Sequence, residues 1–171
     1  MLWPRIVQEV MHGNLPTANW SMAPLRELLR YIVIEYHDCL RLELPALGRR
    51  MAQSPAAQVA LRTFEEALDA NLGQQEEVLF PAIRNCEEAV DAGRPLPTHA
   101  ASAIRDLIPI MKQDQWRLVT LFDKVREQAG DDELPELNDL EADLRVHIQL
   151  ENTILFERVL QLGALGQAER L

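Results

Sequence analysis

Cysteine, aromatic residues and long apolar runs are all scarce in this chain of 171 residues. The two cysteines, Cys39 and Cys86, form no Cys-x-x-Cys pair, so we expect no disulfide framework, and a reducing compartment fits. Aromatic residues make up 5%, too few for a platform that stacks nucleic-acid bases. No apolar run approaches the roughly 18–20 residues of a membrane span, and no secretory signal is visible, so we expect a cytoplasmic protein.

Positive charge is sparse as well. Lysine and arginine number 17 against 27 aspartates and glutamates, which gives a net charge of −10 without any basic cluster. We therefore expect neither nucleic acid nor membrane as a partner. The chain also has no GxSxG motif, glycine-rich phosphate loop or His–Cys nucleophile pair, and we expect a protein that is not an enzyme.

Apolar residues recur instead at helical spacing through most of the chain. They predict helices over about 23–50, from Ser54-Pro55 to about residue 90, from Thr98 to about Gly130, and from about residue 131 onward. We expect Thr98 to cap the third helix and Pro109 to kink or restart it. Short connections between four long helices predict an all-α, antiparallel up-down-up-down bundle over residues 21–165. A short leader (1–20) and a tail (166–171) would flank it.

Each of the four apolar stripes is interrupted by polar residues near its centre. The stripes run through Leu29, Val33, Leu40 and Leu44; Leu61, Phe64, Leu68, Val78 and Ala82; Ile104, Ile108, Met111, Leu118 and Phe122; and Leu137, Leu140, Leu144 and Ile154. The interrupting residues are His37, Asn71, Gln75, Gln115, His147 and Glu151. Two interpretations remain open: a hydrogen-bonded core network, or a metal site formed by His37, His147 and Glu151.

Two segments of the chain echo each other at an offset of 76 residues, NLGQQEEVLF (71–80) and HIQLENTILF (147–156). The offset pairs Asn71 with His147 and Gln75 with Glu151. Two related helices that each offer residues i and i+4 to the core are the way in which bundles build dinuclear metal sites.

Three stretches carry a family likeness: Pro24-Leu25 through Tyr36-His37-Asp38 with the following LPAL (44–47), EEVLFPAI (76–83), and HIQLENTILF (147–156). Together they resemble the RIC proteins, hemerythrin-like di-iron proteins for the repair of iron centres. The resemblance covers about residues 20–162. It implies an antiparallel four-helix bundle in which five histidines and two bridging glutamates hold two irons. It also implies a role in recovering iron–sulfur enzymes after nitrosative or oxidative damage.

Carried over by position, the family pattern keeps three of its seven ligands here, on His37, His147 and Glu151. The remaining positions hold neutral amides: Gln58, Asn71, Gln75 and Gln115. Amides are weak iron ligands, and two adjacent cations need anionic bridges, so we expect a degenerate di-iron site. Glu76, Glu77 and Asp114 lie off the stripes, and we expect none of them to compensate.

These observations predict a hemerythrin-like protein that binds no cofactor. It would act as a non-enzymatic interaction protein in a stress- or iron-related context, as a homodimer or with another protein. Two alternatives are a mononuclear protein that holds one iron or zinc ion through His37, His147 and Glu151, and a di-iron repair protein with atypical ligands.

Overall fold

The computed structural model describes residues 19–168, and the side chains of residues 19–162. Four helical rods follow one another in this part of the chain, and no strand occurs in it. The rods are α2 (Leu25–Ile32), η1 (Val33–His37) and α3 (Asp38–Arg50); α4 (Pro55–Gln74), η3 (Gln75–Leu79) and α5 (Phe80–Asp91); α6 (Thr98–Gln128); and α7 (Leu134–Leu150), η4 (Glu151–Leu155) and α8 (Phe156–Ala168). A 3₁₀ turn, η2 (Met51–Gln53), joins the first two rods.

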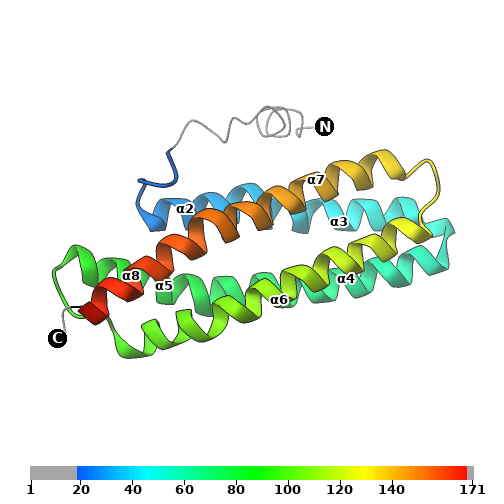
Figure 1. Cartoon of the computed structure of the whole chain (residues 1–171). Coiled ribbons are helices and arrows are strands. Elements are labelled where there is room, and N and C mark those ends of the chain that lie inside the picture. The colour runs from blue at the N-terminus through cyan, green and yellow to red at the C-terminus, as the bar shows by residue number, and fades with distance from the viewer. Residues whose placement is uncertain (1–18, 169–171) are drawn as a thin grey trace.

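The rods run alternately up and down, with the α3–α4 and α6–α7 connections at one end and the α5–α6 connection at the other (Figure 1). The all-α, antiparallel up-down-up-down bundle is therefore confirmed. No helix in the described range is long and apolar enough to cross a membrane. The predicted leader lies outside the described residues except for its last two, and α8 extends into the predicted tail as far as Ala168.

Helix boundaries follow the local sequence signals with two exceptions. Ser54 accepts a hydrogen bond from the backbone nitrogen of Ala57 (3.3 Å), and Pro55 opens α4, as predicted. Thr98 does not cap α6, because it is already the first residue of that helix. Helix α6 also runs without interruption through Pro109, which is exposed, so the carbonyl that loses its helical bond can face water.

The apolar core is divided into two clusters by a buried polar layer. One cluster gathers residues from α2, α5 and α8, including Leu28, Ile32, Ile83, Ile108 and Phe156. The other gathers residues from α3, α4 and α7, including Leu44, Leu61, Phe64, Phe122 and Leu140. Helix α6 contributes to both. The polar residues between them are 0–3% exposed, and they are His37, Asn71, Gln75, Gln115, His147 and Glu151.

The start of α2 is held by groups from distant parts of the chain. Its own N-cap, Pro24, has no side-chain hydrogen bond to offer. The buried carboxylate of Glu87 on α5 instead accepts hydrogen bonds from the backbone nitrogens of Leu25 and Arg26, the second at 3.0 Å. Arg158 on α8 donates to the carbonyl oxygens of the preceding turn. These contacts fix the position of α2 against α5 and α8.

We expect Glu87→Ala to lower the free energy of unfolding by about 1–2 kcal/mol, because two backbone donors lose their acceptor. Urea unfolding followed by circular dichroism measures this loss. Glu88→Ala, one position on and exposed, is the matched control and should stay within about 0.5 kcal/mol of wild type. Equal losses in the two variants would contradict the capping role.

Candidate metal centre

Three of the four rods widen into a π-helical turn beside the polar layer. Each turn is closed by a hydrogen bond from residue i to residue i−5: Asp38 to Val33, Phe80 to Gln75, and Phe156 to Glu151. Turns of this kind insert one extra residue and are frequent at functional sites. Two of them begin at the paired residues Gln75 and Glu151. The two segments that are similar in sequence therefore also share the same backbone geometry.

The π turns explain why parts of the predicted stripes are wrong. Within η3, the predicted stripe residue Val78 is 45% exposed, whereas Leu79 is fully buried. Within η4, Ile154 is half-buried, whereas Leu155 is fully buried. The predicted stripes took a step of three residues from Gln75 and from Glu151, but the wide turn uses one residue more than an α-helical turn, so the residue four positions on lies in the core.

The three predicted metal ligands come together in the polar layer. His37 Nε2 lies 3.2 Å from His147 Nε2, which lies 3.2 Å from Glu151 Oε1. The three ligand atoms all lie within 4.8 Å of one another, and all three residues are buried. Two imidazoles and one carboxylate directed at a common point match the ligand preferences of iron, zinc and manganese.

The His37 ring is prepared for binding at Nε2 by a carboxylate on its far side. Its Nδ1 lies 2.7 Å from Glu76 Oε1, an oxygen that also pairs with Arg41 at 2.8 Å. Burial and then the neighbouring His147 lower the pKa of His37 to about 3, so the ring is neutral at physiological pH. Nδ1 therefore carries the proton, which it donates to Glu76, and the lone pair of Nε2 faces the other ligands.

Glu76 thus has a position that the sequence did not predict. We expected no role for Glu76 because it lies off the apolar stripe. In the structure it lies in the π turn η3 and contacts His37 from outside the polar layer. It contacts the far nitrogen of His37 and is not one of the clustered candidate ligands. A stripe analysis without the π turn could not have found it.

Aromatic rings hold both imidazoles in place. The Tyr36 ring stacks on that of His147, with centroids 5.1 Å apart and an interplanar angle of 8°. The Phe80 ring lies against that of His37 at 5.8 Å and 18°. Tyr36 lies in the π turn η1 and Phe80 directly follows η3, so sequence periodicity did not single them out.

The amides of the layer surround the other oxygen of Glu151. Gln75 Nε2 donates to Glu151 Oε2 at 3.2 Å, and Gln115 Nε2 donates to the same oxygen at 2.6 Å. Gln75 Nε2 also contacts Asn71 Oδ1 at 3.2 Å, and Asn71 Nδ2 lies 3.6 Å from the sulfur of Met111. Neutral donors therefore occupy the side of the carboxylate that would face a second ion in a bridged pair.

Glu151 is an anion in this setting. Burial alone raises the pKa of its carboxyl group, but attraction to His147 and hydrogen bonds with His147 and Gln75 outweigh that effect and lower it below its usual range. Two buried atoms of the layer, Gln75 Oε1 and His147 Nδ1, have no hydrogen-bond partner, and Glu151 Oε1 has only His147 Nε2 beside it, at 3.2 Å. A carboxylate oxygen next to two imidazole nitrogens fits one cation.

Gln58, the remaining substituted position, lies outside the layer. It is half-buried, its Nε2 donates to the carbonyl oxygen of Gly48 at 3.3 Å, and it lines a surface groove with Pro45 and Arg49. The structure therefore brings together six of the seven residues carried over from the family pattern and leaves Gln58 apart from them.

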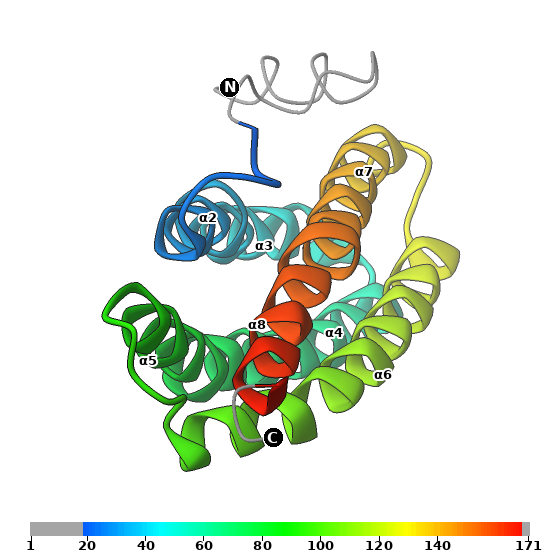
Figure 2. The ribbon, with the colours of Figure 1, turned by 60° about the vertical axis from the view of Figure 1, so that its left-hand side comes forward.

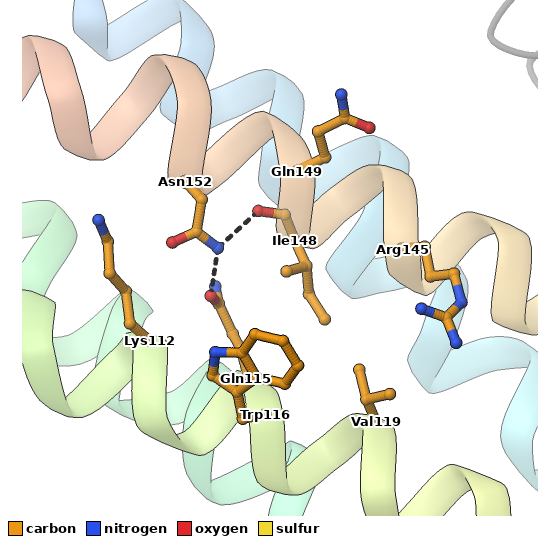
Figure 3. Close-up of a pocket in the computed structure, with 8 residues that line it drawn as sticks. All are labelled: Lys112, Gln115, Trp116, Val119, Arg145, Ile148, Gln149 and Asn152. Carbon is orange, nitrogen blue, oxygen red and sulfur yellow. Dashed lines mark hydrogen bonds between the residues drawn. The ribbon is translucent and has the colours of Figure 1, made fainter.

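A cavity of about 550 Å³ between α6 and the α7–η4 rod reaches the layer at Gln115 (Figure 3). Asn152 Nδ2 donates to Gln115 Oε1 at 2.6 Å and to the carbonyl oxygen of Ile148 at 2.9 Å, as the dashed lines show. The other end of the Gln115 amide bonds Glu151. A single amide therefore separates the cavity from the candidate metal ligands.

A four-helix bundle whose buried layer gathers two histidines and a glutamate has the architecture and donor set of a cation-binding helical bundle. The family model for the hemerythrin HHE cation binding domain matches residues 28–159. The chain belongs to this family, and the predicted resemblance is confirmed.

Among curated proteins, the chain is similar to the iron-sulfur cluster repair protein YtfE of Escherichia coli O81 (strain ED1a) and of Escherichia fergusonii. Each is 26% identical over 165 residues, which cover 83% of this chain and 69% of the relative.

These findings correct one expectation. The sequence analysis predicted no bound cofactor, and that prediction is wrong. The cation-binding family, the iron–sulfur repair relatives and the cluster of His37, His147 and Glu151 all point to iron binding. The prediction relied on amides at four family positions, whereas His37, His147 and Glu151 converge on one point.

We expect Gln75→Glu to destabilise the metal-free protein by about 2–4 kcal/mol at neutral pH, because it places a second buried carboxylate against Glu151. The loss should shrink as the pH falls, since one carboxyl group of the pair then takes up a proton and the repulsion disappears. Urea unfolding in the presence of a chelator measures both effects.

Gln74→Glu is the matched control, because it adds the same charge at a half-buried position one residue away. Its stability should change by no more than about 0.5 kcal/mol. A Gln75→Glu variant as stable as this control would show that Gln75 is not the neutral partner of a buried anion.

Proposed function

We propose that this chain is a single-iron protein of the hemerythrin HHE family, in which His37, His147 and Glu151 hold one ion. When bound, iron with two imidazoles and one carboxylate keeps open positions for water or a small exogenous ligand. The observation that carries the proposal is the convergence of His37 Nε2, His147 Nε2 and Glu151 Oε1 within 4.8 Å.

The charges of the layer support one ion rather than two. His37 is neutral, Glu151 is anionic, and the amides of Asn71, Gln75 and Gln115 add no charge. Two iron ions side by side would repel each other with a single carboxylate to offset them. In the place of a second cation, Gln75 and Gln115 direct N–H groups at Glu151 Oε2 and neutralise that oxygen by hydrogen bonding.

The remaining residues of the layer prepare the site for one ion. Glu76 fixes the His37 ring as the tautomer with a free Nε2, and the stacked ring of Tyr36 orients His147. His147 Nε2 lies 3.2 Å from both His37 Nε2 and Glu151 Oε1, so it is placed between the other two candidate ligands. Gln75 Oε1 is a buried neutral oxygen that can complete the coordination.

We place this single-iron protein in the stress-related handling of iron, next to the repair of iron–sulfur centres. The support is the likeness to relatives named as iron-sulfur cluster repair proteins. We propose a non-enzymatic role, exercised as a homodimer or with a protein partner, in which iron is held and presented rather than used to turn over an organic substrate.

Metal analysis of protein purified without chelator tests the proposal. We expect about one iron per chain, no absorption from an oxo-bridged iron pair, and a loss of about tenfold or more in iron affinity in His147→Ala and Glu151→Ala. His99→Ala is the matched control, since His99 is exposed, and it should bind iron as wild type does. Two irons per chain would refute the single-ion site, and none would refute iron binding altogether.

Glu76→Gln should lower the affinity for Fe²⁺ by about 10–100-fold, because an amide supports the Nδ1–H of His37 less well than a carboxylate does. Competition with a fluorescent chelator under argon measures the dissociation constant. Glu77→Gln removes the same charge from an exposed neighbour and should leave it unchanged. Equal losses of affinity in both variants would show that Glu76 acts through its charge alone and not through its hydrogen bond to His37.

A further inference from the structure

Four rings form an unbroken line from the candidate metal ligands toward the surface. The Tyr36 ring stacks on that of His147 with centroids 5.1 Å apart. The Tyr31 ring meets that of Tyr36 edge-on at 5.9 Å, and the Trp20 ring meets that of Tyr31 at 4.7 Å. All three separations are contact distances between aromatic rings.

Burial decreases along this line. His147 and Tyr36 are each 2% exposed, Tyr31 and Trp20 are half-buried, and the neighbouring Asn19 is exposed. The outer end is anchored as well, because Arg158 donates to the carbonyl oxygen of Trp20 at 2.6 Å. The line therefore has one end on a metal ligand and the other at the surface of the bundle.

The choice of residues along the line is selective. The chain contains two tyrosines, and both lie in it. Packing alone would be served equally well by phenylalanine, yet all four phenylalanines lie elsewhere in the core: Phe64, Phe80, Phe122 and Phe156. Phenols and indoles lose an electron far more readily than benzene rings do, so these positions hold the side chains that can pass on an oxidising equivalent.

We propose that Tyr36, Tyr31 and Trp20 form a path that carries one-electron oxidising equivalents from the metal site to the surface. The inference rests on the proposed function, since the equivalents arise at a bound ferrous ion, and it names hydrogen peroxide as the oxidant. The path protects His37, His147 and Glu151, which would otherwise be the nearest targets.

When bound, ferrous iron would supply one electron to hydrogen peroxide, which gives hydroxide and a hydroxyl radical and leaves the iron ferric. Tyr36 gives a hydrogen atom from its hydroxyl to this radical, which becomes water. Tyr36 then regains an electron and a proton from Tyr31. Tyr31 takes an electron from the Trp20 ring and a proton from water, since the buried Nε1 of Trp20 has no hydrogen-bond partner and keeps its own proton. A low-molecular-weight thiol returns the electron to Trp20 and releases a proton, and two of the resulting thiyl radicals join as a disulfide.

The test treats protein loaded with one equivalent of Fe²⁺ with one equivalent of hydrogen peroxide in air-saturated buffer, without thiol, so that dioxygen adds to the Trp20 radical, and maps oxidised residues by mass spectrometry. We expect oxygen addition at Trp20 in wild type. Tyr36→Phe and Tyr31→Phe should each reduce it by about fivefold and raise oxidation of His147 to a similar degree. Freeze-quenched samples should show a tyrosyl radical by electron paramagnetic resonance in wild type and none in the double variant.

Trp116→Phe is the matched control, because Trp116 is 76% exposed and lies outside the line. It should leave Trp20 oxidation unchanged, and dimethyl sulfoxide, a scavenger of free radicals, should suppress oxidation of Trp116 but not of Trp20. Variants that keep their iron and oxidise Trp20 as wild type does would overturn the path alone. Wild type that binds no iron would overturn the proposed function and remove the source of the oxidising equivalents.

Discussion

The buried carboxylate of Glu151 is the group around which the centre of the bundle is organised. A charge this deep is costly unless both oxygens have partners. Oε2 is satisfied by N–H donors from two helices, Gln75 and Gln115, whereas Oε1 faces His147 and lacks a conventional hydrogen-bond donor. The two oxygens thus separate the layer into a half that is complete by itself and a half that is suited to a cation.

This asymmetry relates the chain to its family. A carboxylate that bridges two cations would offer one oxygen to each. Here two amides donate to one oxygen of Glu151 without adding charge, and the other oxygen faces His147. The amides of Asn71, Gln75 and Gln115 depend on one another, because removing one of them would leave an incomplete set of donors around Oε2 or an unpaired polar group in the core.

The amino-acid pattern predicted the four rods, their antiparallel order and the six residues of the polar layer. Helical periodicity depends on local geometry, and a polar residue within an apolar stripe is visible without any knowledge of its contacts. The pattern failed where the backbone departs from 3.6 residues per turn. Tyr36, Leu79 and Leu155 are buried because η1, η3 and η4 each hold an extra residue.

The sequence also did not reveal residues whose role depends on contacts with neighbouring helices. Glu76 is held by Arg41 and His37 on the first rod, and Asn152 is bonded to Gln115 on the third rod. Gln58 entered by family position alone, and its own contact, with Gly48, lies away from the centre. Counting ligands at the family positions likewise suggested a site that binds no metal. The convergence of His37, His147 and Glu151 in space indicates instead a site for one ion.

In the three π turns, the number of residues per helical turn helps to form the candidate metal centre. Deleting one residue from η4 would return that rod to α-helical geometry, and the residues beyond the turn would keep their present faces, because the turn holds one residue more than an α-helical turn. A deletion in the α-helical part of the rod would instead rotate all following residues by about 100° relative to the preceding ones. Descendants of this chain can thus lose a residue at a π turn more readily than elsewhere in these rods.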